Sequence, residues 1–116
     1  VNGTLRSTAN NGGYFSKEDT AVVAGGNITI TNATRGLLVF CNQTNSNTSL
    51  LLFDAGTGAL VIVSETTAGK LVNADPGAGT SKVWVSFSGN NLVFTNRWAA
   101  SQALHVELIG AANLPS

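Results

Sequence analysis

The chain has few side chains that could carry out a reaction. His105 is the only histidine of the 116 residues, and Glu107 lies two positions later in the same apolar segment. Side chains two apart on a strand share a face, so the pair could exchange a proton, although a polar strand face is the commoner cause of this spacing. Asp54 and Glu65 flank another apolar segment like a glycosidase carboxylate pair, but at strand ends they are more simply turn residues. The sequence therefore predicts no catalytic residue and no enzyme activity.

Cysteine and glycine positions indicate no cofactor or metal site. Cys41 is the only cysteine, which excludes an internal disulfide and a cysteine-rich metal site. It ends the apolar segment RGLLVFC, so we expect a buried structural thiol. The glycine-rich segments DAGTG and DPGAGT lack the lysine and following helix of a phosphate-binding loop. Each also offers a cation only one carboxylate, so we expect no cofactor and no metal.

Aromatic side chains outside the apolar faces indicate a recognition surface. Tyr14, Trp84 and Trp98 are such residues, and Arg97 precedes Trp98 in a loop between the last two predicted strands. Aromatic faces stack on sugar rings and arginine donates to hydroxyl groups, so all four are candidate ligand-binding residues. Tryptophan and arginine are also enriched where subunits meet, so packing between subunits is the alternative interpretation.

Short strands and turns account for nearly the whole chain after residue 17. Apolar or alternating segments recur between clusters of Gly, Asn, Asp and Ser: TAVVAG, NITITN, RGLLVFC, SLLLFD, ALVIVSE, GKLVN, KVWVSFS, NLVFTN and ALHVELIG. The glycines of DAGTG and SGNN predict hairpin turns. The pattern predicts an all-β fold, a jelly-roll-like antiparallel β-sandwich of about eight to nine strands. Residues 18–116 would form this single domain, and residues 1–17 a linker or an extended arm.

The distribution of apolar residues on the two faces of these strands indicates whether the domain associates with other subunits. KVWVSFS alternates apolar and polar residues, as expected when one strand face is buried. By contrast, RGLLVFC, SLLLF and GALVIV are apolar on both faces, although a two-layer sandwich buries one face of each sheet. Exposed apolar faces usually mark interfaces, so we expect a homo-oligomer; cover by loops or by the N-terminal arm is the alternative. The predicted interface residues are Leu38, Phe40, Val61 and Val63.

Charge and composition exclude some partners. Six basic and six acidic residues cancel, and charged residues make up 10% of the chain. Binding to nucleic acid or to an anionic membrane needs clustered basic residues, which this sequence lacks. No apolar segment approaches the roughly 20 residues that span a bilayer. The start at Val1 and the absence of methionine favour a fragment or a processed product, and the single cysteine favours synthesis in a reducing cytoplasm.

Three segments carry a resemblance to a known family. NNLVFTNRWAASQALHVELIG, ITITNATRGLLVFC and SLLLFDAGTGALVIVSE resemble the C-terminal domains of bacteriophage tailspike and tail-fibre proteins, over residues 27–110. The resemblance implies a β-sandwich at the distal end of a homotrimeric spike, made in the bacterial cytoplasm and carried in the virion tail. Such domains hold the trimer together, and some bind host surface polysaccharide. No catalytic residue carries over, because glycan-degrading activity in this family usually lies in an upstream domain.

Two other functions remain open at this stage. A carbohydrate-binding module or lectin domain attached to an enzyme would have the same residue types and would more often be monomeric. A capsid decoration protein or fibre head would share the apolar faces and have no glycan site. Oligomeric state separates the first of these from the spike hypothesis, and glycan binding separates the second.

Overall fold

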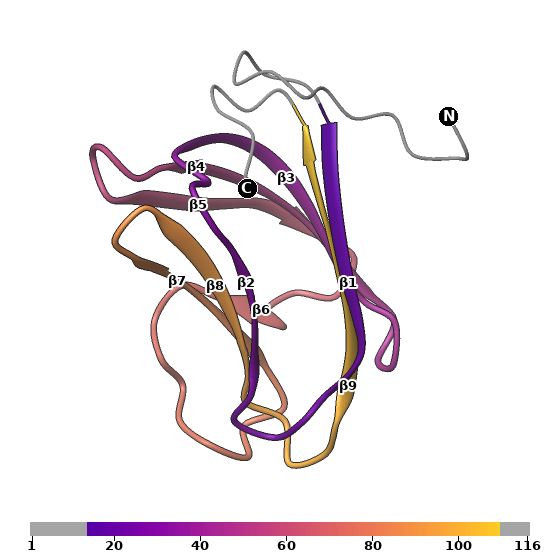
Figure 1. The fold of residues 1–116 in the computed structure, drawn as a ribbon. Helices are drawn as coiled ribbons and strands as arrows, with labels where there is room; N and C mark the ends of the chain where they lie inside the picture. The colour runs from indigo at the N-terminus through magenta and orange to yellow at the C-terminus, as the bar shows by residue number, and fades with distance from the viewer. Residues whose placement is uncertain (1–13, 110–116) are drawn as a thin grey trace.

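The computed structural model describes residues 14–109, with Tyr14 placed by its backbone alone. The strands are β1 (Tyr14–Val22), β2 (Asn27–Ile30), β3 (Arg35–Asn42), β4 (Asn47–Asp54), β5 (Ala59–Glu65), β6 (Leu71–Val72), β7 (Val83–Ser88), β8 (Asn91–Asn96) and β9 (Gln102–Ile109). They form a five-stranded sheet, β1-β9-β3-β4-β5, and a four-stranded sheet, β2-β8-β7-β6. The sheets lie against each other, and the described residues contain no helix (Figure 1). The predicted all-β sandwich is confirmed.

The first two strands of the described chain pair with the last two. β1 pairs with β9 and β2 pairs with β8, both antiparallel, which is the pairing of outer strands in a jelly roll. β3, β4 and β5 follow one another as a meander, and only β6 and β7 pair in parallel within the described residues. The predicted hairpins at DAGTG and SGNN are confirmed, with Gly58 (φ 72°) and Gly89 (φ 61°) in the left-handed conformation that their turns require.

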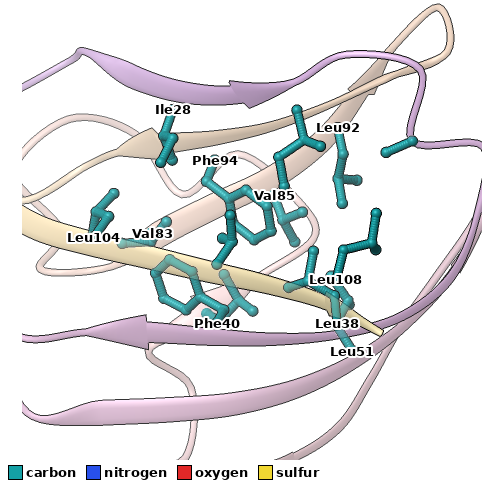
Figure 2. Close-up of a cluster of buried hydrophobic side chains, with 14 of the residues drawn as sticks. Ile28, Leu38, Phe40, Leu51, Val83, Val85, Leu92, Phe94, Leu104 and Leu108 are labelled. Atoms are coloured by element: carbon teal, nitrogen blue, oxygen red, sulfur yellow. The ribbon is translucent and has the colours of Figure 1, made fainter. Parts of the chain in front are cut away.

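The core lies between the inward faces of the two sheets (Figure 2). Phe40 of β3 and Phe94 of β8 stack across it, with ring centroids 5.1 Å apart. Fully buried aliphatic side chains surround this pair: Leu38, Leu51, Leu104, Val106 and Leu108 from the five-stranded sheet, and Ile30, Val83, Val85 and Leu92 from the four-stranded sheet. Burial of each large side chain contributes about 1.5–3 kcal/mol. This packing fixes the strand ends from which the loops emerge.

The first strand differs from the expectation. β1 runs from Tyr14 to Val22, so it begins before the expected domain boundary at residue 18 and ends within TAVVAG. Its pairing with β9 holds Lys17, Glu18 and Asp19 in extended conformation although their side chains are exposed. An edge strand has one unpaired side and tolerates charged residues, so hydropathy alone missed it. The chain turns after Val22, with Gly25 at φ 78°.

Candidate functional site

Three connections meet at one end of the sandwich, below β2 and β9 in Figure 1. They are the β1–β2 turn (residues 23–26), the β6–β7 loop (73–82) and the β8–β9 loop (97–101). Backbone hydrogen bonds join all three: the amide of Gly25 donates to the carbonyl of Asn96 at 2.9 Å, and that of Thr80 to the carbonyl of Arg97 at 3.0 Å. We call this region the loop end.

Arg97 occupies the centre of the loop end. Its Nε donates to Oδ1 of Asp75 at 3.0 Å and its Nη2 donates to Oδ2 at 2.8 Å, a bidentate ion pair between the β8–β9 and β6–β7 loops. The guanidinium carbon also lies 5.3 Å from the ring centroid of Trp84, within cation–π distance. Two of the predicted ligand-binding residues therefore lie together, and Asp75 joins them.

Asp75 is held in its charged form. The backbone amide of Gly77 donates to Oδ1 at 3.0 Å and is the main cause that lowers the pKa of this carboxyl below its usual value. Desolvation opposes this effect in part, and the hydrogen bonds and charge of Arg97 add to the lowering. This role of Asp75 could not be predicted from the sequence, because Asp75 and Arg97 are 22 residues apart.

Trp98 packs inside its own subunit. Its side chain is half-buried against the core, and Nζ of Lys70 lies 5.3 Å from its ring centroid. Its Nε1 is buried and has no hydrogen-bond partner among the described residues. The two interpretations from sequence, stacking on sugar or packing between subunits, both left out this packing within the monomer.

Asn96 connects the end of β1 to the β8–β9 loop. The side chain is fully buried, and its Nδ2 donates to the carbonyls of Val22 and Ala100 at 2.9 and 3.0 Å, with a longer contact to Val23 at 3.3 Å. Its Oδ1 accepts from the backbone amide of Trp98 at 2.8 Å. Sequence analysis missed this residue because asparagine is frequent throughout the chain.

A hollow of about 390 Å³ opens at the loop end. Residues from all three connections line it: Ala24, Gly25, Ala78, Gly79, Asn96, Arg97, Trp98 and Ala99. Tyr14 lies elsewhere: its backbone pairs with Ile109, whereas the loop end adjoins Gln102 at the opposite end of β9. Its side chain is outside the described residues.

A second candidate site is the outer face of the five-stranded sheet. Ile109, Leu37, Leu52 and Val61 are register partners in that order across β9, β3, β4 and β5. Val61, Val63, Leu52 and Ile109 are 52%, 50%, 47% and 40% exposed. We call this surface the outer apolar patch; it consists of Leu37, Val39, Leu50, Leu52, Val61, Val63 and Ile109.

Two of the predicted interface residues do not belong to this patch. Leu38 and Phe40 are fully buried between the sheets, so they cannot contact another subunit in the folded domain. Successive strand residues alternate between faces, and the outward residues of β3 are Leu37 and Val39. Val61 and Val63 do face outward, as the interface prediction requires.

Cys41 and His105 are opposite each other on the same outer face. They are register partners in β3 and β9, and Glu18 is the partner of His105 in β1. His105 Nε2 lies 3.0 Å from Oε1 of Glu107, and its Nδ1 lies 3.4 Å from Oε1 of Glu18. The prediction of a buried Cys41 was wrong, because the thiol is half-buried and outward-facing, with Sγ 3.6 Å from Oγ1 of Thr48.

Asp54 and Glu65 stabilise backbone turns. Oδ1 of Asp54 accepts from the amide of Gly56 at 2.9 Å, and the carboxylate of Glu65 accepts from the amides of Gly69 and Leu71 at 2.8 and 2.7 Å. In the described part of the chain, no three His, Cys, Asp or Glu side chains gather where they could hold a metal ion. The same residues include no helix with the length and apolarity to cross a bilayer.

Comparison with known proteins does not identify the chain: no family model, no curated protein and no solved structure matches it. The outer apolar patch and the loop end are therefore the features from which a function is inferred.

Proposed function

We propose that this domain is the distal trimerisation and host-recognition domain of a bacteriophage tailspike or tail fibre, located in the virion tail. The outer apolar patch carries the proposal. Monomeric proteins rarely leave a contiguous apolar area of this kind in water, and such areas usually mark interaction sites. The sequence resemblance to tailspike and tail-fibre C-terminal domains supplies the biological setting.

The opposite face of the sandwich shows that the patch is a local feature. The outward positions of the four-stranded sheet are mainly polar: Thr29, Ser86 and Ser88, with Thr95, which is buried, and the half-buried Trp84 and Val93. Two sheets of one domain therefore differ in what their outer faces can contact. Association through the five-stranded sheet would leave the polar sheet in water.

The shape of the patch supports a second copy of this chain as its partner. Leu50 pairs with Ser64 and Leu51 with Ile62, so Val63 is the extra residue of a β-bulge. Beside it lies a hollow of about 280 Å³, lined in part by Val39, Leu50 and Ser64. A projecting valine and a hollow on the same face allow each copy to insert Val63 into the next, and a head-to-tail contact of this kind forms a ring when the rotation between copies closes, as the proposed trimer requires.

Trimerisation would also serve recognition. Each subunit would present one loop end, and three linked sites bind a repetitive surface with far greater avidity than one site. In this arrangement the five-stranded sheet assembles the spike and the loop end meets the host.

Light scattering on three proteins tests the trimer. The native domain should have three times the monomer mass, and Val63→Asp should be monomeric, because each interface would bury an unpaired carboxylate at a cost of several kcal/mol. Val63 is 50% exposed in the single chain, so the variant monomer should keep its circular dichroism spectrum. Ser88→Asp, on the exposed end of β7 in the other sheet, is the matched control and should remain trimeric. A monomeric native domain would contradict the proposal and favour a carbohydrate-binding module.

A further inference from the structure

We propose that the hollow at the loop end binds one neutral saccharide residue of a surface glycan. The inference rests on the host-recognition part of the proposed function and names the ligand class and the site. Its evidence is independent of the outer apolar patch, since the loop end lies at one end of the sandwich and the patch lies on a sheet face.

The size and lining of the hollow fit a sugar ring. A volume of about 390 Å³ lies at the lower end of the usual range for small-molecule sites, roughly 300–1,000 Å³. Five of its eight lining residues are alanine or glycine: Ala24, Gly25, Ala78, Gly79 and Ala99. Methyl groups and bare backbone form a surface against which the C–H groups of a pyranose can pack.

Arg97 supplies directed donors to this hollow. Its guanidinium has five N–H groups, and Asp75 engages Nε and Nη2. The Nη1 amino group is thereby left for a ligand, with its orientation set by the bidentate ion pair and by the ring of Trp84. Arginine fixed in this way donates to ring or hydroxyl oxygens without losing side-chain entropy on binding.

The charge of the site selects a neutral sugar. Asp75 compensates the charge of Arg97 and its lowered pKa keeps the carboxylate ionised at neutral pH. An acidic sugar would have to displace Asp75 or approach it at close range, and like charges repel. A neutral sugar can accept from Arg97, which lines the hollow, without bringing a second carboxylate close to Asp75.

The site is formed before any ligand arrives. Backbone hydrogen bonds tie the β1–β2 turn and the β6–β7 loop to residues 96 and 97, and Arg97 donates its own amide to the carbonyl of Lys82 at 2.9 Å. Trp98 serves as packing beneath the hollow, because Lys70 covers its ring and the core lies against it. Replacing Trp98 would therefore disturb the fold, and a test of binding needs a different variant.

Filling the hollow is the cleaner test. Ala78 lines the hollow and is exposed, so Ala78→Phe should occupy the space without breaking a hydrogen bond. Ala74 is an exposed alanine of the same loop that does not line the hollow, so Ala74→Phe is the matched control. The probes are the methyl glycosides of glucose, galactose, mannose, rhamnose and N-acetylglucosamine, with methyl glucuronide as the acidic comparison. Each is titrated by ¹H–¹⁵N NMR to about 20 mM, enough to saturate a site with a Kd of about 1 mM.

The expected result is a set of amide shifts at residues 24–25, 78–79 and 97–99 with at least one neutral glycoside. Ala78→Phe should weaken this binding at least about tenfold, Ala74→Phe should preserve it, and methyl glucuronide should bind more weakly. The inference is overturned by the absence of shifts at these residues with every neutral glycoside, by equal binding to Ala78→Phe, or by preferential binding of the glucuronide. Light scattering on the same samples separates the two proposals: a trimer without binding overturns only the saccharide site, and a monomer with binding overturns only the trimer.

Discussion

At the scale of single residues, Asn96 does most to hold the loop end together. It is a fully buried amide, and its two polar atoms serve both the end of β1 and the β8–β9 loop. A buried amide with all its partners stabilises the fold, whereas loss of the amide leaves each partner unsatisfied and away from water. Asn96 therefore connects the packing of the core to the geometry of the candidate ligand site.

Asn96→Ala should lower the free energy of unfolding by about 3 kcal/mol, because the carbonyls of Val22 and Ala100 and the amide of Trp98 lose their partner. Urea denaturation followed by tryptophan fluorescence measures the change. Asn73→Ala is the control: Asn73 is exposed and donates only to the carbonyl of Leu60 among the described residues, so its loss should cost less than about 1 kcal/mol. Equal effects of the two substitutions would show that Asn96 is not a structural centre.

Asp75 gives the loop end a dependence on pH. Its pKa is lower in the folded domain than in the unfolded chain, so the carboxylate contributes stability that is fully present above the ordinary aspartate pKa of about 3.9. That contribution is lost as the pH falls through the lower, folded-state pKa. The difference in Tm between the native domain and Asp75→Asn should stay constant from about pH 8 to pH 5 and shrink below about pH 4. A difference that does not change with pH would contradict the contacts of the Asp75 carboxylate, first with the amide of Gly77 and then with Arg97.

At the scale of elements, the inward face of a strand can be predicted from the sequence only where apolar and polar residues alternate. The alternation in KVWVSFS and ALHVELIG identified the inward faces of β7 and β9 correctly, and Val83, Val85, Leu104, Val106 and Leu108 are all buried. In RGLLVFC every position from Leu37 to Cys41 is apolar, so the sequence holds no signal for which face is inward. Pairing with β4 and β9 decides it, and places Leu38 and Phe40 inside and Cys41 outside.

The loop end was predictable in part. An Arg–Trp pair between the last two strands marked the β8–β9 loop, and the structure brings Trp84 to Arg97. The partners Asp75 and Lys70 could not be predicted, because they reach the site through the parallel β6–β7 pair and the packing of the two sheets. Contacts between loops depend on the order of strands in each sheet, which local sequence patterns do not encode.

At the scale of the whole molecule, the two proposals concern different surfaces of the domain. The five-stranded sheet has outward valine, leucine and isoleucine in register across four strands, and the four-stranded sheet has mainly serine and threonine at its outward positions. The connections of the loop end occupy neither face and emerge at one end of the sandwich. Association through one sheet, as proposed, would therefore leave the loop end free to meet a ligand.

The central claim is that copies of this chain meet through the outer apolar patch, and covalent capture tests it most directly. In a Cys41→Ser background, Val61→Cys places one thiol in the patch, and Ser88→Cys places one on the exposed end of β7 in the opposite sheet. A short trifunctional maleimide is added to each folded variant at micromolar protein concentration. It should link three copies of Val61→Cys into a covalent trimer, because their thiols lie within reach of one linker, and it should leave Ser88→Cys monomeric. A monomeric Val61→Cys product, or equal capture of both variants, would contradict the account.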